Sequence, residues 1–300
     1  MTGEVQILSD ADLPGVWRDA DKSSEQGQRW ALILTGAKVG GGALAALGGI
    51  FALQDGGIGM APWVVLIGFV LALVSEIASW VFQPEKDWYV GRAVAESAKT
   101  LAWRYAVGAD PFPASLARAT AEELFRERMS LVADQVSDRI VFESPHAVIT
   151  PRMDELRQST FADRRVAYVE GRTLDQHRWY SSKARENRRR ANIWRFFLIV
   201  AEVAAVSLAA GQLLGAWDID LAGLLAASIA AGTAWVAVKQ FSPLASAYSV
   251  AAKELALQEA KLRTVAEDRW TLVAADAEEA ISREHTTWIA SRTGGATSRG

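Results

Sequence analysis

The chain has 300 residues, of which 50% are hydrophobic and 22% charged, and its formal net charge is −3. The near balance of 32 basic and 35 acidic residues argues against a generally basic nucleic-acid-binding protein, so we expect no nucleic-acid partner. The absence of cysteine excludes disulfides, cysteine-based metal sites and thiol nucleophiles. Hydrophobic and charged residues are segregated into blocks, and this segregation first indicates a membrane protein.

The N-terminal part of the chain predicts two membrane spans. The first thirty residues are acidic and contain no apolar run, so we expect no cleaved secretory signal. Residues Ala31 to Leu53 then contain one charge, Lys38, and residues Pro62 to Phe82 contain one, Glu76. Each segment has the roughly 20 residues with which a helix crosses about 30 Å of hydrocarbon.

Two further apolar segments predict a second pair of spans. Ile193 to Leu214 has Arg195 at its edge and Glu202 inside, and an uncharged segment runs from Leu221 to Val238, with the span ending near residue 241. Buried helices of a soluble α-protein are the alternative, but such helices seldom stay apolar on every face for this length. The expected fold is an all-α membrane protein with two transmembrane helical hairpins and long cytoplasmic helices.

Basic residues predict the orientation in the membrane. The short connections within the hairpins, residues 54–61 and 215–220, contain no Lys or Arg, whereas residues 84–192 contain 19. The positive-inside rule then places both termini and the central region in the cytoplasm of a bacterial cell, with the protein in the inner membrane.

Three ionisable residues fall well inside the predicted spans, away from their edges. Lys38 and Glu76 lie at matching depth, roughly 10 Å from the cytoplasmic boundary, and could pair within one hairpin. Glu202 lies at similar depth in span three without an obvious partner in span four. An unpaired charge at this depth costs about 2–3 kcal/mol on insertion scales. The three residues either line a polar path, or form a structural ion pair plus a glutamate that faces the bundle interior or another subunit.

Small residues predict close helix packing in the membrane. Span one contains six glycines, among them the pair Gly36 and Gly40, and span three repeats Ala201, Ala205 and Ala209. Small residues at four-residue spacing let helix backbones approach closely. Tight hairpins and oligomers both remain open, and the Gly36/Gly40 pair alone is a weak motif.

A faint internal repeat relates the two halves. Phe82-Gln83-Pro84 ends span two and Phe241-Ser242-Pro243 ends span four, which predicts a parallel duplication. Between the halves, Pro145 and Pro151 bracket the run 148–150, which we expect to be a short strand or an extended linker. After Pro243 a heptad-like stripe predicts one long helix that packs on residues 161–192 or on their copy in a neighbouring subunit; its members are Leu244, Tyr248, Ala251, Leu255, Leu262, Val265 and Leu272.

No catalytic motif occurs in the sequence. We find no phosphate-binding loop, zinc-protease motif, nucleophile elbow or dinucleotide fingerprint, and the three histidines, at 146, 177 and 285, are isolated. We therefore predict that the chain is not an enzyme and has no cofactor or metal. The alternative of an enzyme acting on lipid is supported only by Glu202 and scattered hydroxyl groups.

Several segments resemble bacterial tandem SLATT-domain proteins of the DUF4231 type, whose modules are two-helix membrane effectors. The most specific are residues 88–100 (WYVGRAVAESAKT) and 278–288 (EEAISREHTTW), supported by residues 19–24 (DADKSS) and by Tyr168 with Arg172. The resemblance covers nearly the whole chain. It implies an N-terminal hairpin domain (1–143), a linker (144–159), a C-terminal hairpin domain (160–291) and a disordered tail (292–300).

The resemblance implies an oligomeric effector that forms pores or perturbs the membrane in a bacterial defence system. Expected partners are the lipid bilayer, further copies of the chain, and a nucleotide second messenger or sensor protein. The alternative is a membrane-anchored scaffold whose cytoplasmic helices recruit a partner. Residues next to the membrane are candidates for a packed collar or for ligand binding: Trp88, Arg92, Glu96, Lys99, Arg188, Arg189 and Arg190.

Overall fold

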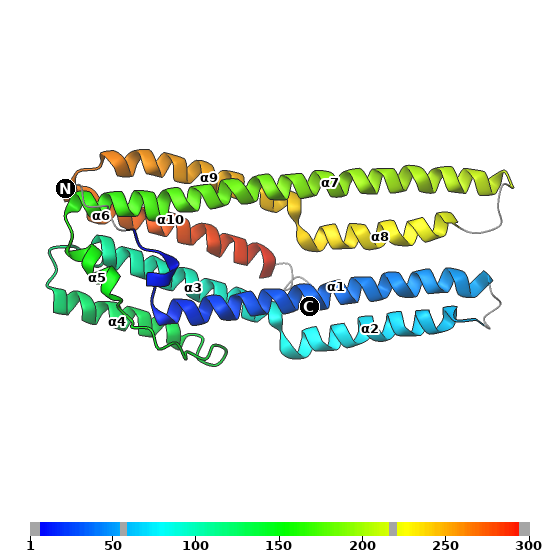
Figure 1. Cartoon of the computed structure of the whole chain (residues 1–300), viewed down its shortest axis with the longest axis horizontal. Coiled ribbons are helices and arrows are strands. Elements are labelled where there is room, and N and C mark those ends of the chain that lie inside the picture. Colours follow the sequence, from blue (N-terminus) through cyan, green and yellow to red (C-terminus); the bar gives the residue numbers. More distant parts are fainter. Residues whose placement is uncertain (1–6, 55–58, 216–220, 294–300) are drawn as a thin grey trace. The chain divides into compact units, whose positions relative to one another are not determined.

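A computed structural model describes residues 7–54, 59–215 and 221–293, and every regular element within these ranges is helical (Figure 1). Four helices are long and apolar enough to cross a membrane. The predicted all-α membrane fold with four spans is therefore confirmed. The predicted connections within the two hairpins, residues 54–61 and 215–220, lie largely outside the described residues. The predicted tail also lies outside them beyond Thr293.

The chain divides into two compact units, which are described separately. The membrane unit comprises residues 29–84 and 182–248. The head unit comprises the residues up to Gln28, Glu85–Ser181, and the residues from Ser249 onward. Both units are built from segments of both halves of the sequence.

The first hairpin of the membrane unit is formed by α1 (Gly15–Gln54) and α2 (Ala61–Phe82), which lie side by side in Figure 1. Pro62 stands in the first turn of α2, where a helix lacks a partner for the backbone N–H in any case. The helix α1 begins well before the predicted span because no proline separates Gly15 from Ala31.

The second hairpin is formed by α7 (Leu174–Leu213) and α8 (Leu221–Lys239). The helix α7 also begins before its predicted span, since residues 182–192 are rich in Ala, Arg, Lys and Glu, which favour helix. The helix α8 ends before the predicted limit near residue 241, because Gln240 adopts a left-handed conformation with φ 51°. An ordered helix cannot continue through such a residue.

The parallel repeat is visible in helix lengths and in these left-handed residues. A 40-residue helix opens each half, and a 24-residue helix follows each return span: α3 (Pro84–Val107) and α9 (Phe241–Thr264). Gln83, with φ 47°, separates α2 from α3 as Gln240 separates α8 from α9. The structural register pairs Gln83 with Gln240. The predicted repeat, which matched Pro84 with Pro243, was therefore wrong in its register. Pro84 opens its helix, whereas Pro243 lies within the first turn of α9.

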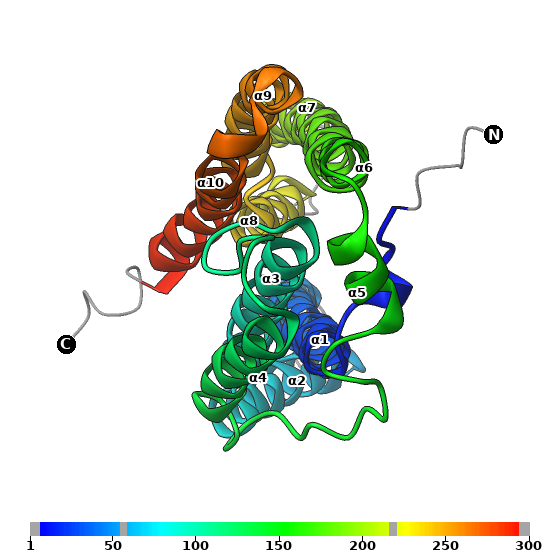
Figure 2. The ribbon, with the colours of Figure 1, turned by 90° about the vertical axis from the view of Figure 1, so that its left-hand side faces the viewer.

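The head unit contains an aromatic core. Its helices besides α3 and parts of α1, α7 and α9 are α4 (Arg118–Asp134), α5 (Pro151–Gln158), α6 (Phe161–Tyr168), the π-helical turn η2 (Val169–Thr173) and α10 (Glu267–Thr293). Tyr105 of α3 packs on Phe125 of α4 at 5.0 Å between ring centroids, and Figure 2 shows these two helices side by side. Trp270 of α10 donates a hydrogen bond to the carbonyl oxygen of Val107 over 2.8 Å. These contacts close the core around α3.

The prediction of a single long helix after Pro243 was wrong. The helix ends at Thr264, and α10 begins at Glu267 with a different face inward, so Leu255 and Leu262 are buried whereas Leu272 is 65% exposed. Near its end, α9 does lie against the segment expected from the sequence, since Arg263 pairs with Glu170 of η2 over 2.8 Å. The packing of the rest of the stripe on that segment stays a prediction. The run 148–150 forms no strand: Val148 and Ile149 lie in a bend, and Thr150 is the N-cap of α5.

Candidate functional site

The ionisable residues of the first hairpin form an ion pair. The Lys38 ammonium of α1 contacts the Glu76 carboxylate of α2, so the two residues predicted to lie at one depth are brought together. Their side chains are nevertheless 53% and 57% exposed. The pair therefore joins the two helices on a surface of the hairpin that is left uncovered by the described residues.

Glu202 of α7 has no such partner. Within the described parts of the chain its carboxylate makes no hydrogen bond or ion pair, and its side chain is exposed. Neighbours on the same helical face are apolar and exposed: Ile199, Val203 and Val206. The structure thus places a lone carboxylate on an apolar surface of the second hairpin, where charge is costly in a membrane.

The helices of the first hairpin approach most closely at glycines other than the predicted pair. A Cβ atom on Gly68 would lie 2.6 Å from the backbone nitrogen of Ala45, and one on Gly41 would lie 2.6 Å from the carbonyl oxygen of Gly68. Among the described atoms, nothing lies within 4 Å of a Cβ built on Gly40, and Gly36 faces Trp235 of α8 at 3.6 Å. The Gly36/Gly40 motif therefore does not form the α1–α2 contact.

Four collar candidates lie along α3 in the head unit. Arg92 pairs with Glu96 over 2.7 Å and approaches Asp21 of α1 at 3.8 Å, as the spacing of the two residues on a helix predicts. Lys99 pairs with Asp10 over 2.7 Å. Trp88 stacks on its neighbour Tyr89, and its carbonyl oxygen accepts a hydrogen bond from Ser24.

These contacts join α3 to the N-terminal part of the chain. Close approach is also built into the backbone, since a Cβ on Gly91 would lie 2.7 Å from the nitrogen of Ser24. This geometry agrees with a packed collar; whether the same residues bind a ligand stays a prediction.

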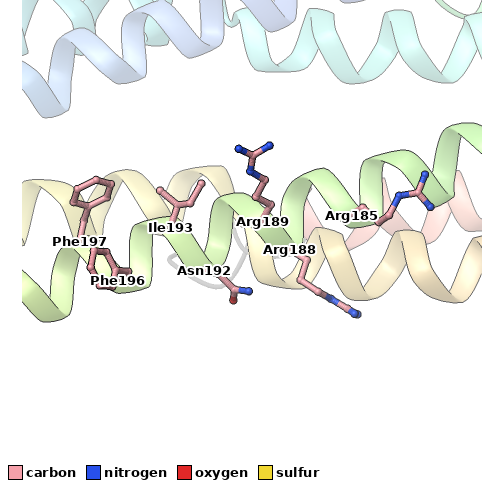
Figure 3. A pocket seen from close by; sticks show the side chains of 7 residues that line it. All are labelled: Arg185, Arg188, Arg189, Asn192, Ile193, Phe196 and Phe197. Atoms are coloured by element: carbon pink, nitrogen blue, oxygen red, sulfur yellow. The ribbon is translucent and has the colours of Figure 1, made fainter.

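The remaining collar candidates, Arg188, Arg189 and Arg190, lie on α7 in the membrane unit. Arg190 pairs with Glu186 over 2.5 Å, and Lys183 contacts the same carboxylate over 3.2 Å. Arg188 and Arg189 line a shallow groove on one face of α7, together with five further residues: Arg185, Asn192, Ile193, Phe196 and Phe197 (Figure 3).

A buried ionic cluster in the head unit was not predicted as a site. Arg172 donates from Nε to Oε1 of Glu278 over 2.9 Å and from Nη2 to Oε2 over 3.0 Å. The same carboxylate accepts hydrogen bonds from the hydroxyls of Tyr168, at 3.0 Å, and Thr100, at 2.9 Å. Arg172 and Glu278 are 1% and 0% exposed, so the pair is fully removed from solvent.

Burial and charge shift the pKa values in this cluster. Burial raises the pKa of the Tyr168 hydroxyl well above its usual value, and the negative charge of Glu278 adds to this effect. Burial acts to lower the pKa of Arg172, but the charge and hydrogen bonds of Glu278, together with a smaller contribution from Glu96, raise the pKa overall. The cluster is therefore a fixed ion pair with protonated tyrosine beside it.

The π-helical turn η2 contains Arg172; such turns are rare in proteins and occur frequently at functional sites. Both Arg172 and Glu278 stand in the segments that resemble SLATT proteins, so the sequence contained a signal. The two residues are 106 positions apart, however, and no local pattern indicates their contact.

The fold and these sites define a multi-pass membrane protein made of two helical hairpins in tandem. Within the described residues no group of three or more His, Asp or Glu side chains is placed to hold a metal ion. Residues 14–165 match the model of the SMODS and SLOG-associating 2TM effector domain 3, and residues 168–288 match that of domain 1. The chain belongs to this SLATT family and carries two of its domains in tandem.

The comparisons add no further relative. Neither the search of curated proteins nor that of solved structures found a match to the chain. The predicted linker, residues 144–159, lies inside the first matched region, and the predicted domain limits stay a prediction.

Proposed function

We propose that this tandem SLATT protein is an oligomeric effector that permeabilises the bacterial inner membrane in a conflict system. Its family supplies the coarser statement, since both matched models describe two-transmembrane-helix effector domains. Pore formation and assembly are the steps proposed here. No catalytic chemistry or cofactor enters the proposal.

The lone carboxylate of Glu202 carries the proposal. An ionised side chain at this depth costs about 2.5–3.5 kcal/mol on insertion scales unless it meets a partner or water. The described residues of its own chain offer neither a partner nor enclosed water. In the third and fourth candidate spans, the most apolar segment of 18 residues contains no residue that is buried inside the chain. A second copy of the chain, or a water-filled path between copies, satisfies this carboxylate.

The Lys38–Glu76 pair supports the same conclusion. More than half of each side chain is uncovered although the two form an ion pair. In an assembly, such pairs from several copies would place alternating charges along a polar path. Four spans per chain are too few to enclose a wide pore, so the proposed pore requires a symmetric homo-oligomer.

The proposed topology has both termini and the head unit in the cytoplasm, because the basic residues concentrate in those parts of the sequence. A trigger would then act on the head unit from the cytoplasm. We propose a nucleotide second messenger or a sensor protein in that role, consistent with the association named in the family description.

The test uses full-length protein in liposomes that contain a self-quenched dye. We expect oligomers in nanodiscs and dye release from the liposomes, and we expect Glu202→Leu to lower release at least about tenfold or to dissociate the oligomer. Ser207→Ala is the matched control, because this residue lies on the same span and is likewise exposed. A monomeric protein that never releases dye, with or without added cyclic nucleotides, would refute the proposal.

A scaffold is the second candidate, favoured by exposed apolar residues in the head unit. Val250 and Leu257, seven residues apart on α9, are 57% and 66% exposed. If Leu257→Ser abolishes the cellular phenotype while Glu202→Leu and Lys38→Met leave it intact, the protein recruits a partner instead of opening the membrane.

A further inference from the structure

A groove on α7 combines three arginines with an apolar end. Its lining residues recur at three- and four-residue spacings along an open groove of about 760 Å³. Figure 3 shows two ridges, with Arg189, Ile193 and Phe197 pointing to one side and Arg188 and Asn192 to the other. These are the ridges that residues four apart form on any helix, and the space between them is the α7 groove.

The arginines of the α7 groove have no counter-charge among the described residues. Within the ranges that the structure describes, Arg185, Arg188 and Arg189 make no hydrogen bond or ion pair, and all three are exposed. The nearest carboxylate in sequence, Glu186, is already held by Lys183 and Arg190. Three guanidinium groups therefore remain available to an external anion, and a guanidinium fork matches the oxygens of a phosphate.

The polarity of the α7 groove changes along the helix. From Arg185 to Phe197 the helix rises about 18 Å, from arginines through the amide of Asn192 to Ile193 and the two phenylalanines. Phe196 and Phe197 are 64% and 61% exposed and belong to the apolar span. A ligand that fills the groove must carry an anionic group at one end and a hydrocarbon chain at the other.

We propose that the α7 groove binds an anionic phospholipid of the adjacent leaflet. The headgroup phosphate lies between Arg185, Arg188 and Arg189, and an acyl chain runs along Ile193 and the phenylalanines. A soluble phosphate compound would leave the apolar end empty, and a nucleotide base there would have to enter the hydrocarbon region.

The first hairpin lacks this feature. The corresponding stretch of α1 before its span, residues 21–29, holds two basic and two acidic residues, Asp21, Lys22, Glu25 and Arg29. If the arginines served only to orient the chain in the membrane, they would not need to lie on one face of the helix. They would also not need to be free of ion pairs with carboxylates. The asymmetry between the two halves assigns lipid recognition to the second hairpin.

The experiment measures lipid retention by full-length protein in a neutral detergent with native mass spectrometry. We expect phosphatidylglycerol to bind at least about fivefold more tightly than phosphatidylcholine with the same acyl chains. A single basic residue near a charged headgroup contributes about 1 kcal/mol, which corresponds to about this ratio of affinities. The double variant Arg188→Gln/Arg189→Gln should lose this preference. The control Arg190→Gln/Arg195→Gln, with the same charge change on the same helix outside the groove, should keep it.

Three outcomes would overturn the proposal. The first is equal binding of the two lipids, and the second is an equal loss in the control variant. The third is displacement of phosphatidylglycerol by glycerol phosphate or ATP at equal concentration, which would show a site for a free phosphate compound. All variants concern exposed side chains, so folding is expected to be unchanged. Because no arm measures conduction, failure here is distinguishable from failure of the proposed pore.

Discussion

Arg172 and Glu278, 106 positions apart, form a two-bond ion pair that is closed to solvent. The pair joins η2 to α10, and Thr100 of α3 donates to the same carboxylate. Since Thr100 lies in the first matched domain and the other residues in the second, this cluster holds the two SLATT domains together within the head unit.

Removing the carboxylate of Glu278 should destabilise the head unit. Glu278→Ala leaves the Arg172 charge buried without a partner, and loss of one member of such a pair costs about 3–5 kcal/mol. The measurement is chemical denaturation of purified full-length protein, followed by tryptophan fluorescence. As a control, Glu122→Ala removes a carboxylate that pairs with two exposed arginines and should leave the stability nearly unchanged. Equal effects of the two substitutions would contradict a special role for the buried pair.

Tyr105 should make stability fall at high pH. Burial, with a smaller contribution from the nearby Asp154 carboxylate, raises the pKa of the Tyr105 hydroxyl from 10.0 to about 12. The folded state therefore keeps a proton that the unfolded state releases, so the contribution is complete below pH 10 and is lost as pH rises towards 12. Tyrosinate absorbance of the wild type minus that of Tyr105→Phe reports the midpoint; a folded protein with a midpoint near 10 would disprove the shift.

Gly68 should tolerate no side chain. A Cβ at this position meets the backbone of both Ala45 and Gly41 at 2.6 Å, so the helices α1 and α2 must separate in Gly68→Val. Overpacking of this kind costs about 1–3 kcal/mol. Thermal unfolding in detergent is the measurement, and Gly40→Val, where the structure places nothing within 4 Å, is the matched control. A control as unstable as the variant would indicate a general effect of β-branched residues in the span.

The cysteine-free chain permits a direct test of topology. A single cysteine at Glu143, in the head unit, should stay unlabelled by a membrane-impermeant maleimide in intact spheroplasts and react after lysis. A cysteine at Asp55, between the first two spans, should react in both preparations. The reverse pattern would invert the proposed orientation and place the head unit outside the cytoplasm.

Hydropathy alone was sufficient to predict the four spans, because apolar runs of this length seldom form anything other than transmembrane helices. It did not reveal which glycines pack, since Gly36, Gly40 and Gly41 are alike in sequence and only the rotation of α1 against α2 distinguishes them. The end of α9 at Thr264 was equally hidden, because neither proline nor glycine marks it. The buried Arg172–Glu278 pair depends on tertiary packing and has no local pattern.

Within each half, the two spans are connected to the head unit in different ways. In each half one 40-residue helix runs through the unit boundary without a break, whereas the return span ends at a left-handed glutamine, Gln83 or Gln240. An unbroken helix continues its backbone hydrogen bonds from one unit into the other, whereas a left-handed residue interrupts them. Lys38 and Glu202 each stand on such an unbroken helix, so the two residues that we propose for the polar path are joined to the head unit by continuous helical backbone.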